Sequence, residues 1–206
     1  MSERDFFSDE AKRATAASVQ SAETQTSAEI VVAVRKSSGR YRVLAYHCGL
    51  AFAFLVVSYL LLVPAVYSIE AIALDGIVAF AAGSLLAANF DTLQRALSRA
   101  STLDGNVSSG ARAAFFDLGI SRTSGRNGLL VYASMFERRC VVLTDIGIEP
   151  ARLGRRWAVS EQELAEAVKR RDLSAFQRAV AQLGGVLGDA YPRSADDVNE
   201  LSDEVQ

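Results

Sequence analysis

Two long apolar segments follow one another in the first half of the chain and constrain its fold more than any other feature. An uncharged run extends from Val43 to Ile69, and a second apolar run from Ala71 to Phe90 follows almost at once. A helix needs about 20 apolar residues to cross the hydrocarbon core of a bilayer, and each run supplies that length. Within the first run, the expected span from Ala45 to about Val63 closes at Pro64, so the connection to the second span is short. The pattern predicts a transmembrane helical hairpin over residues 43–90.

The charges beside the apolar runs predict how the hairpin is oriented. Basic residues stand outside both runs, and the turn between the runs carries none: Arg35, Lys36, Arg40, Arg42, Arg95 and Arg99. By the positive-inside rule, both polar flanks are expected on the cytoplasmic side of a multi-pass membrane protein. The alternative is a pair of buried helices in a soluble protein. The rest of the chain is too small to surround two such helices.

The polar remainder predicts one interrupted domain. Residues 1–42 and 91–192 are each short for a domain of their own, so we expect them to fold together, followed by an acidic tail over residues 193–206. The net charge of −2 gives no general attraction to nucleic acid, and we expect no nucleic-acid partner. The two cysteines, Cys48 and Cys140, are interpreted as reduced, apolar thiols.

Local patterns predict a mixed α/β order. Helices are expected over Ser8–Thr24, Val107–Leu118, Ser160–Arg170 and Leu173–Ala190, and strands over Glu29–Val34, Gly128–Ala133 and Arg139–Thr144. Asp104, Gly105 and Asn106 are expected to break the helix that returns from the membrane. Ser160 and Glu163 have the spacing of a capping box. The last two strands form a hairpin, and the order predicts a small sheet covered by helices.

The segment from Phe115 to Pro150 resembles the core of the TPM domain. The resemblance is carried by Gly119-Ile120, Asn127-Gly128, the strand Leu129–Tyr132, Glu137–Arg139 and Asp145–Gly147. The position of the hairpin, and Asn199-Glu200-Leu201 near the end, are similar to a bacterial branch of that family. The resemblance implies an α/β/α sandwich with a small mixed sheet, interrupted by a transmembrane helical hairpin, in the bacterial inner membrane. Among family members, acid phosphatase activity and calcium binding are ascribed to some, and accessory roles in membrane complexes to others.

Carboxylates near the end of the third strand are candidate metal ligands. Asp145 and Glu149 follow that strand, and Asp117 lies near the end of the preceding helix. Oxygen ligands of this kind suit a hard cation such as Ca²⁺. The simpler alternative is that Asp145 caps a turn and Glu149 is solvated.

Arginines in the same part of the sequence are candidate anion ligands. Arg122, Arg126, Arg138 and Arg139 are expected around the same loops, where they would bind phosphate groups of a substrate or of lipid headgroups. The alternative is ordinary solvated charge. The loop 121–128 lacks the lysine of a nucleotide-binding P-loop, which argues against nucleotide binding.

No set of residues in the sequence converges on a catalytic pattern. We therefore expect a membrane-anchored accessory or scaffolding factor that contacts the lipid bilayer and a membrane-protein partner. The alternative function is a metal-dependent, calcium-binding acid phosphatase-like hydrolase that uses Asp145, Glu149 and Asp117 with the nearby arginines.

Overall fold

The computed structural model describes residues 3–193, 199–201 and 205, and it divides into two units. Unit 1 comprises Met1–Ser38 and Asp104–Gln206, and unit 2 comprises Gly39–Leu103. The predicted hairpin over residues 43–90 lies within unit 2. The predicted tail over residues 193–206 is described only at Arg193, at 199–201 and at Val205.

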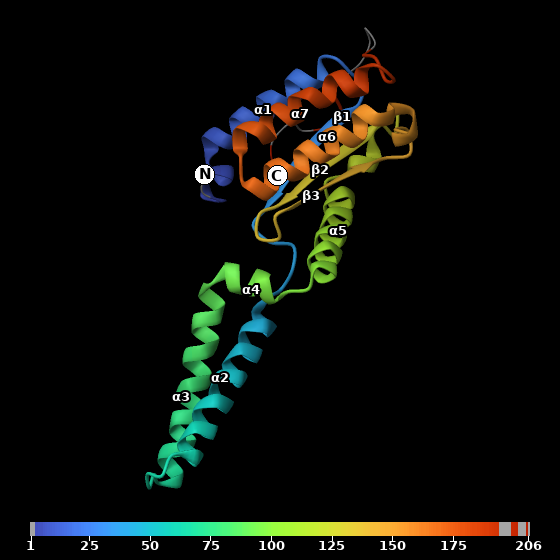
Figure 1. Cartoon of the computed structure of the whole chain (residues 1–206). Coiled ribbons are helices and arrows are strands. Elements are labelled where there is room, and N and C mark those ends of the chain that lie inside the picture. The colour runs from blue at the N-terminus through green and yellow to red at the C-terminus, as the bar shows by residue number, and fades with distance from the viewer. Residues whose placement is uncertain (1–2, 194–198, 202–204, 206) are drawn as a thin grey trace. The chain divides into compact units, whose positions relative to one another are not determined.

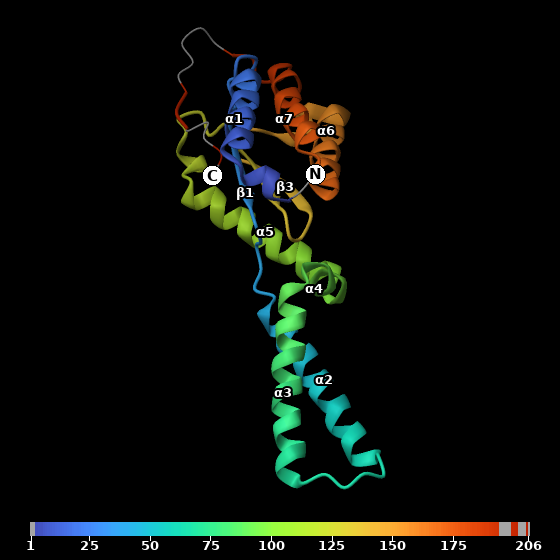
Figure 2. The same ribbon diagram turned by 90° about the vertical axis from the view of Figure 1, so that its left-hand side faces the viewer.

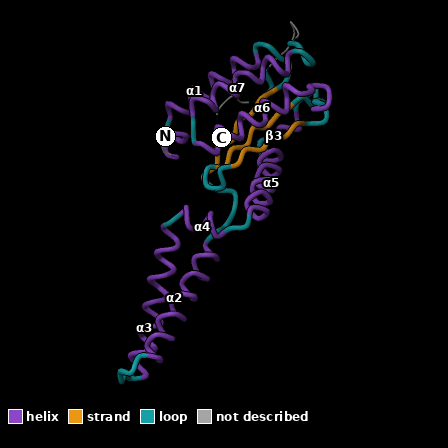
Figure 3. Tube along the Cα trace, in the orientation of Figure 1, coloured by secondary structure: helices purple, strands orange, loops and turns teal. Residues whose placement is uncertain are grey.

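Unit 1 contains a three-stranded mixed sheet (Figure 3). Strand β1 (Glu29–Arg35) pairs in parallel with β2 (Gly128–Ser134), and β2 pairs antiparallel with β3 (Arg139–Thr144). Val131 at the centre of β2 stands opposite Val32 on one side and Val142 on the other. The predicted strands and the hairpin between the last two are confirmed.

Helices cover both faces of this sheet. On one face, α1 (Asp9–Glu23), α7 (Leu173–Gly188) and α6 (Pro150–Arg170) lie side by side in that order, as Figure 2 shows. On the other face lies α5 (Ala100–Asp117), so the strands stand between two helical layers (Figure 1). Short 3-10 turns occur at Glu3–Phe7 and Ile120–Arg122. The chain is thus mainly helical, with a small mixed sheet.

The alternation of side chains along the strands produces two cores. Ile30, Val32, Leu129 and Val131 point to the face covered by α1, α6 and α7. Their neighbours in sequence, Val31, Ala33, Leu130 and Tyr132, point to α5 and pack with Val107 and Ala111. Because successive residues of a strand face opposite sides, a strand buried on both faces is apolar throughout, as these strands are.

The predicted helix break at Asp104–Asn106 is wrong. Helix α5 runs through these residues without interruption. A glycine inside a helix costs about 1 kcal/mol relative to alanine. Burial of Val107, Ala111 and Ala114 at helical spacing further along α5 offsets that cost.

The predicted capping box at Ser160 is also wrong. Helix α6 begins at Pro150 and kinks at Gly154, which has a φ of 63°. Ser160 lies inside the helix, and its hydroxyl donates a hydrogen bond of 3.2 Å to the carbonyl of Arg156. Pro150 is the residue in the sequence that signals the start of α6. Proline is favoured at the first position of a helix, because the N–H group that it lacks would have no partner within the helix there.

Unit 2 is a helical hairpin with a short third helix. Helices α2 (Arg42–Leu62) and α3 (Ile69–Asn89) are each 21 residues long, and α4 (Asp91–Leu97) follows. In the most apolar stretches of α2 and α3, only 11% and 17% of the residues are buried. The buried Gln94 of α4 donates hydrogen bonds to the carbonyls of Ala87 and Ala88, which end α3.

Small residues let α2 and α3 approach one another closely. A Cβ atom at Gly49 would clash with Ser84 Oγ and lie 2.6 Å from the Phe80 carbonyl oxygen. A Cβ atom at Gly83 would lie 2.9 Å from Phe52 Cβ. The contact between the two helices therefore requires glycine at these positions.

We predict that Gly49→Ala destabilises the helical hairpin. The added methyl has no space, and overpacking costs roughly 1–3 kcal/mol. Gly76→Ala is the matched control, because its Cβ would meet only Val57 Cγ2, at 3.1 Å. The measurement is denaturant-induced unfolding of the full chain in detergent micelles. Equal stability of the two variants would contradict the close contact at Gly49.

Candidate functional site

Polar side chains gather at the end of the sheet where β1 and β2 finish. We call Ser37, Ser38, Tyr132, Ser134 and Glu137 the junction cluster. Glu137 is fully buried in the turn between β2 and β3. Its Oε1 atom accepts hydrogen bonds from the Ser38 amide at 2.9 Å and from the Ser37 hydroxyl at 3.3 Å. Its Oε2 atom accepts a short hydrogen bond from the Ser134 hydroxyl.

The hydroxyl groups of the junction cluster form a directed chain. Ser38 donates to Ser134 at 2.8 Å, and Ser134 donates to Glu137. Because the Ser38 hydroxyl already donates its proton to Ser134, it can only accept from the Tyr132 hydroxyl, which lies 2.9 Å from Ser38 Oγ. Gly110 of α5 makes room for this chain, because a Cβ atom there would lie 2.6 Å from the Tyr132 hydroxyl.

The β2–β3 turn and the first residue of β3 bind the two residues of unit 1 that border the insertion in the sequence. Ser38 is the last residue of unit 1 before the hairpin, and Glu137 binds its amide. Asp104 is the first residue of unit 1 after the hairpin, and Arg139 forms an ion pair with it, with Nε 2.7 Å from Oδ1. In addition, Met135 and Phe136 donate backbone hydrogen bonds to Arg35 and Lys36. These contacts therefore fix Ser38 and Asp104, the two residues of unit 1 that border the insertion in the sequence, at one end of the sheet.

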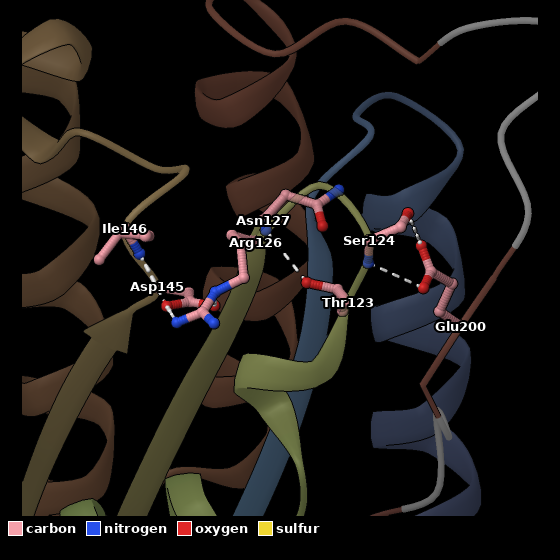
Figure 4. Close-up of polar contacts among 7 residues, drawn as sticks. All are labelled: Thr123, Ser124, Arg126, Asn127, Asp145, Ile146 and Glu200. Carbon is pink, nitrogen blue, oxygen red and sulfur yellow. Dashed lines mark hydrogen bonds and ion pairs between the residues drawn. The ribbon is translucent and has the colours of Figure 1, made fainter.

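A second polar group lies at the opposite end of the sheet (Figure 4). The Arg126 guanidinium forms an ion pair with the buried carboxylate of Asp145, with distances of 2.7 Å from Nε to Oδ2 and 3.0 Å from Nη2 to Oδ1. Asp145 Oδ1 also accepts the Ile146 amide at 2.8 Å. Arg126 has a left-handed backbone with φ of 50°, and its carbonyl accepts the Gly147 amide. These contacts bind the loop before β2 to the turn after β3.

Glu200, near the chain end, binds the same loop. Its carboxylate accepts the Ser124 amide at 3.0 Å and the Ser124 hydroxyl at 2.6 Å, as Figure 4 shows. These two hydrogen bonds lower the pKa of Glu200 below its ordinary value of 4.5, because they stabilise the ionised carboxylate. These hydrogen bonds attach Glu200 to the loop before β2.

The three predicted metal ligands do not come together. Among the residues that the structure describes, no group of three or more His, Cys, Asp or Glu side chains is arranged to hold a metal ion. Asp117 ends α5 and is exposed, and Glu149 is exposed at the start of α6. Asp145 is paired with Arg126 and bonded to its own turn. This arrangement agrees with the simpler alternative, in which Asp145 caps a turn and Glu149 is solvated.

The four predicted anion-binding arginines do not surround the same loops. Arg122 and Arg126 precede β2, whereas Arg138 and Arg139 follow it. Six steps along a strand span about 20 Å, so the two pairs lie at opposite ends of the sheet. The four arginines were expected together because they lie close to one another in the sequence. Arg126 and Arg139 are each committed to a carboxylate, of Asp145 and Asp104 respectively.

Cys140 in β3 is not an activated nucleophile. Burial, with a smaller contribution from the negative charge of Glu161, raises the pKa of its thiol to about 12. A thiol with so high a pKa carries almost no thiolate near neutral pH. This agrees with the expectation of an apolar, reduced cysteine, and both cysteines are free.

The sequence analysis missed the junction cluster. The sequence pattern draws attention to Glu137 only within the segment Glu137–Arg139, and it indicates no role for Ser37 and Ser38. A usable signal was present, because Glu137 lies between a buried apolar strand and a second strand only a few residues later. A carboxyl group in so tight a turn next to a core is expected to bind nearby backbone or hydroxyl donors.

Comparison with known proteins supports the fold. No protein-family model and no curated protein sequence matches the chain. The chain is similar to the NMR structure of the BA42 protein from the psychrophilic bacterium Bizionia argentinensis, with a TM-score of 0.56 and 16% sequence identity. The match covers 96% of this chain and 92% of that protein. At this identity the similarity concerns the fold.

We predict that Glu137→Ala destabilises the protein by roughly 2–4 kcal/mol, because each buried donor left without an acceptor costs about 1–3 kcal/mol. The donors concerned are the hydroxyl of the buried Ser134 and the amide of the half-buried Ser38, whereas the hydroxyl of the exposed Ser37 can bind water instead. Glu163→Ala, on the exposed side of α6, is the control and is expected to change stability by less than about 0.5 kcal/mol. Urea unfolding of the full chain in micelles measures both. Equal effects would show that the junction cluster is not a stabilising element.

We also predict that acid releases Glu200 from Ser124. A carboxylate with a lowered pKa in the folded state adds stability above its unfolded pKa and loses it as the pH falls through the folded pKa. The contact is therefore complete above pH 4.5 and is lost below it. The Ser124 amide resonance, followed by NMR from pH 7 downward, is expected to shift in this window. Glu200→Gln should abolish the shift, and a shift that persists in this variant would contradict the assignment.

Proposed function

We propose that this chain is a membrane-anchored TPM-like domain that acts as an accessory or scaffolding factor for membrane proteins. In this proposal unit 1 is an α/β/α sandwich, and α2 and α3 are a transmembrane hairpin inserted between β1 and α5. The observation that carries the proposal is the exposure of large apolar side chains along both helices. Leu50, Leu55 and Leu62 of α2 and Ile77 and Leu85 of α3 are each more than 60% exposed.

Such a surface requires an apolar environment. Soluble proteins rarely expose a continuous apolar patch of more than a few hundred Å², and both helices carry one along their length. Each helix has the roughly 20 residues needed to cross a bilayer. The Gly49 and Gly83 contact provides the close packing by which helices associate where water gives no driving force.

The basic residues support a cytoplasmic position for unit 1 in the bacterial inner membrane. Arg40 and Arg42 stand before or at the start of α2, and Arg95 and Arg99 follow α3. The connection over residues 63–68 has no lysine or arginine. The positive-inside rule places the connection outside the cell and the two flanks inside.

The sheet end beside the junction cluster supports a contact with lipid headgroups. Arg35 and Lys36 are exposed at the end of β1, and Arg138 and Arg139 follow β2 at the same end. Basic side chains near an anionic leaflet each contribute about 1 kcal/mol of attraction. The junction cluster binds Ser38, the last residue of unit 1 before the insertion, at this basic end of the sheet.

We predict that the full chain stays in the membrane pellet after alkaline carbonate extraction. The double variant Leu55→Asp with Ile77→Asp should be extracted, since each aspartate near the centre of a span costs about 2.5–3.5 kcal/mol on insertion. Val66→Asp, in the fully exposed connection, is the matched control and should remain in the pellet. Sedimentation of the double variant together with the wild type would contradict a transmembrane anchor.

The accessory role is tested by activity. The purified full chain is expected to hydrolyse phosphomonoesters no faster than Asp145→Asn, with or without millimolar Ca²⁺. Enzyme-like turnover that is lost in Asp145→Asn would favour the alternative function, a calcium-dependent phosphatase, over the proposed one.

A further inference from the structure

The two borders of the sheet differ in how well they are protected. At the β1 border, Ile30, Val31, Val32 and Ala33 are at most 3% exposed, and the Glu23 carboxylate accepts the outward Ile30 amide at 2.8 Å. At the β3 border, all six residues of the strand are half-buried. Among the residues that the structure describes, the strand order β1-β2-β3 leaves no further strand beside β3 (Figure 3).

Three residues of β3 direct their backbone groups away from β2. The Asp145 amide donates to the Gly128 carbonyl at 2.8 Å, so Asp145 belongs to the set that faces β2. In an antiparallel pair this set alternates, and it therefore includes Leu143 and Val141. The backbone groups of Cys140, Val142 and Thr144 then point outward. None of the hydrogen bonds within the described part of the chain uses these groups.

The β3 border also lacks the usual protective residues. Natural edge strands carry lysine, proline, an inward charge or a bulge, which prevent pairing with another chain. The β3 sequence Arg-Cys-Val-Val-Leu-Thr has one charge, and that arginine is paired with Asp104 of α5. β3 pairs with β2 in a regular register from Arg139 to Thr144, without a bulge. An edge of this kind, whose single charge is already paired, is a template for strand addition.

The sequence of this edge is complementary to itself. The outward backbone groups of one copy meet those of another in antiparallel pairing when the two-fold axis passes through Val142. In that register, Cys140 stands opposite the partner's Thr144, and Val141 opposite the partner's Leu143. Arg139 stands opposite the partner's Asp145, and each of these two side chains is already paired within its own copy, with Asp104 and Arg126 respectively. In this register no like charges face one another, and apolar side chains stand opposite apolar side chains from Val141 to Leu143.

We propose that β3 is an interaction edge at which two copies of this chain pair antiparallel about a two-fold axis through Val142, which makes one sheet continuous across the dimer. The interface is isologous, because each copy contributes the same strand. Strand pairing alone buries less than the roughly 800 Å² per partner of a stable interface, so the dimer is a reversible one. The inference does not depend on the membrane anchor.

Cysteine cross-linking of the full chain in micelles tests the register. In a background of Cys48→Ala and Cys140→Ala, Val142→Cys places two thiols across the axis, where Cα atoms of a hydrogen-bonded pair are about 5.5 Å apart. Thr144→Cys is the matched control, because its two copies stand about 13 Å apart along the strand, beyond the roughly 7 Å limit for a disulfide. Under an oxidant, Val142→Cys is expected to form dimer at least about ten times faster than Thr144→Cys, since only its geometry allows the bond. Equal rates, or no dimer from Val142→Cys, would overturn the proposal.

Amide exchange on the unmodified chain gives an independent readout that no variant can disturb. Protection of the Cys140, Val142 and Thr144 amides should rise with protein concentration. The Val141 and Leu143 amides, which face β2, should be protected at every concentration. Outward amides that exchange freely at all concentrations would refute the dimer. Outward amides that are protected independently of concentration would also refute it, because another segment or partner would then occupy the edge.

Discussion

The parallel pairing of β1 with β2 is the constraint on which the rest of unit 1 depends. Parallel neighbours cannot be joined by a tight turn, so the chain must leave the carboxyl end of β1 and return to the amino end of β2. Here that crossover contains α5 and the whole of unit 2. An insertion of this size is tolerated because its two connections leave the seven paired positions of β1 and β2 undisturbed.

The two polar groups at the ends of the sheet have different physical roles. At the carboxyl end, a buried carboxyl group and a directed chain of hydroxyls fix Ser38, and an ion pair fixes Asp104. At the other end, Arg126 covers Asp145 and joins the loop before β2 to the turn after β3. Neither group presents an open set of nucleophile, base and anion donors. The first group holds the two residues that border the insertion, and the second joins two loops at the other end of the sheet.

The sequence predicted the elements that depend on regular periodicity. All three strands, the β2–β3 hairpin and the apolar lengths of α2 and α3 follow from the spacing and composition of apolar residues. It failed where tertiary burial overrides local preference, as at Gly105 in α5 and at Ser160 in α6. Site residues were the least predictable. The four arginines were expected in one cluster because they are close in the sequence, but β2 separates them into two pairs. Glu137 acquires its hydrogen bonds only when Ser37 and Ser38, which lie about 100 residues earlier in the sequence, fold against it.

The central claim is that the α2–α3 hairpin crosses a membrane with both flanks on the cytoplasmic side. Its most direct test is labelling of single cysteines by a membrane-impermeant maleimide in intact cells, in a chain with Cys48 and Cys140 replaced by alanine. Val66→Cys, in the exposed connection between the helices, should react from outside. Glu163→Cys, on the exposed side of α6, should react only after the membrane is permeabilised. Reaction of Glu163→Cys in intact cells, or protection of Val66→Cys until permeabilisation, would contradict the account.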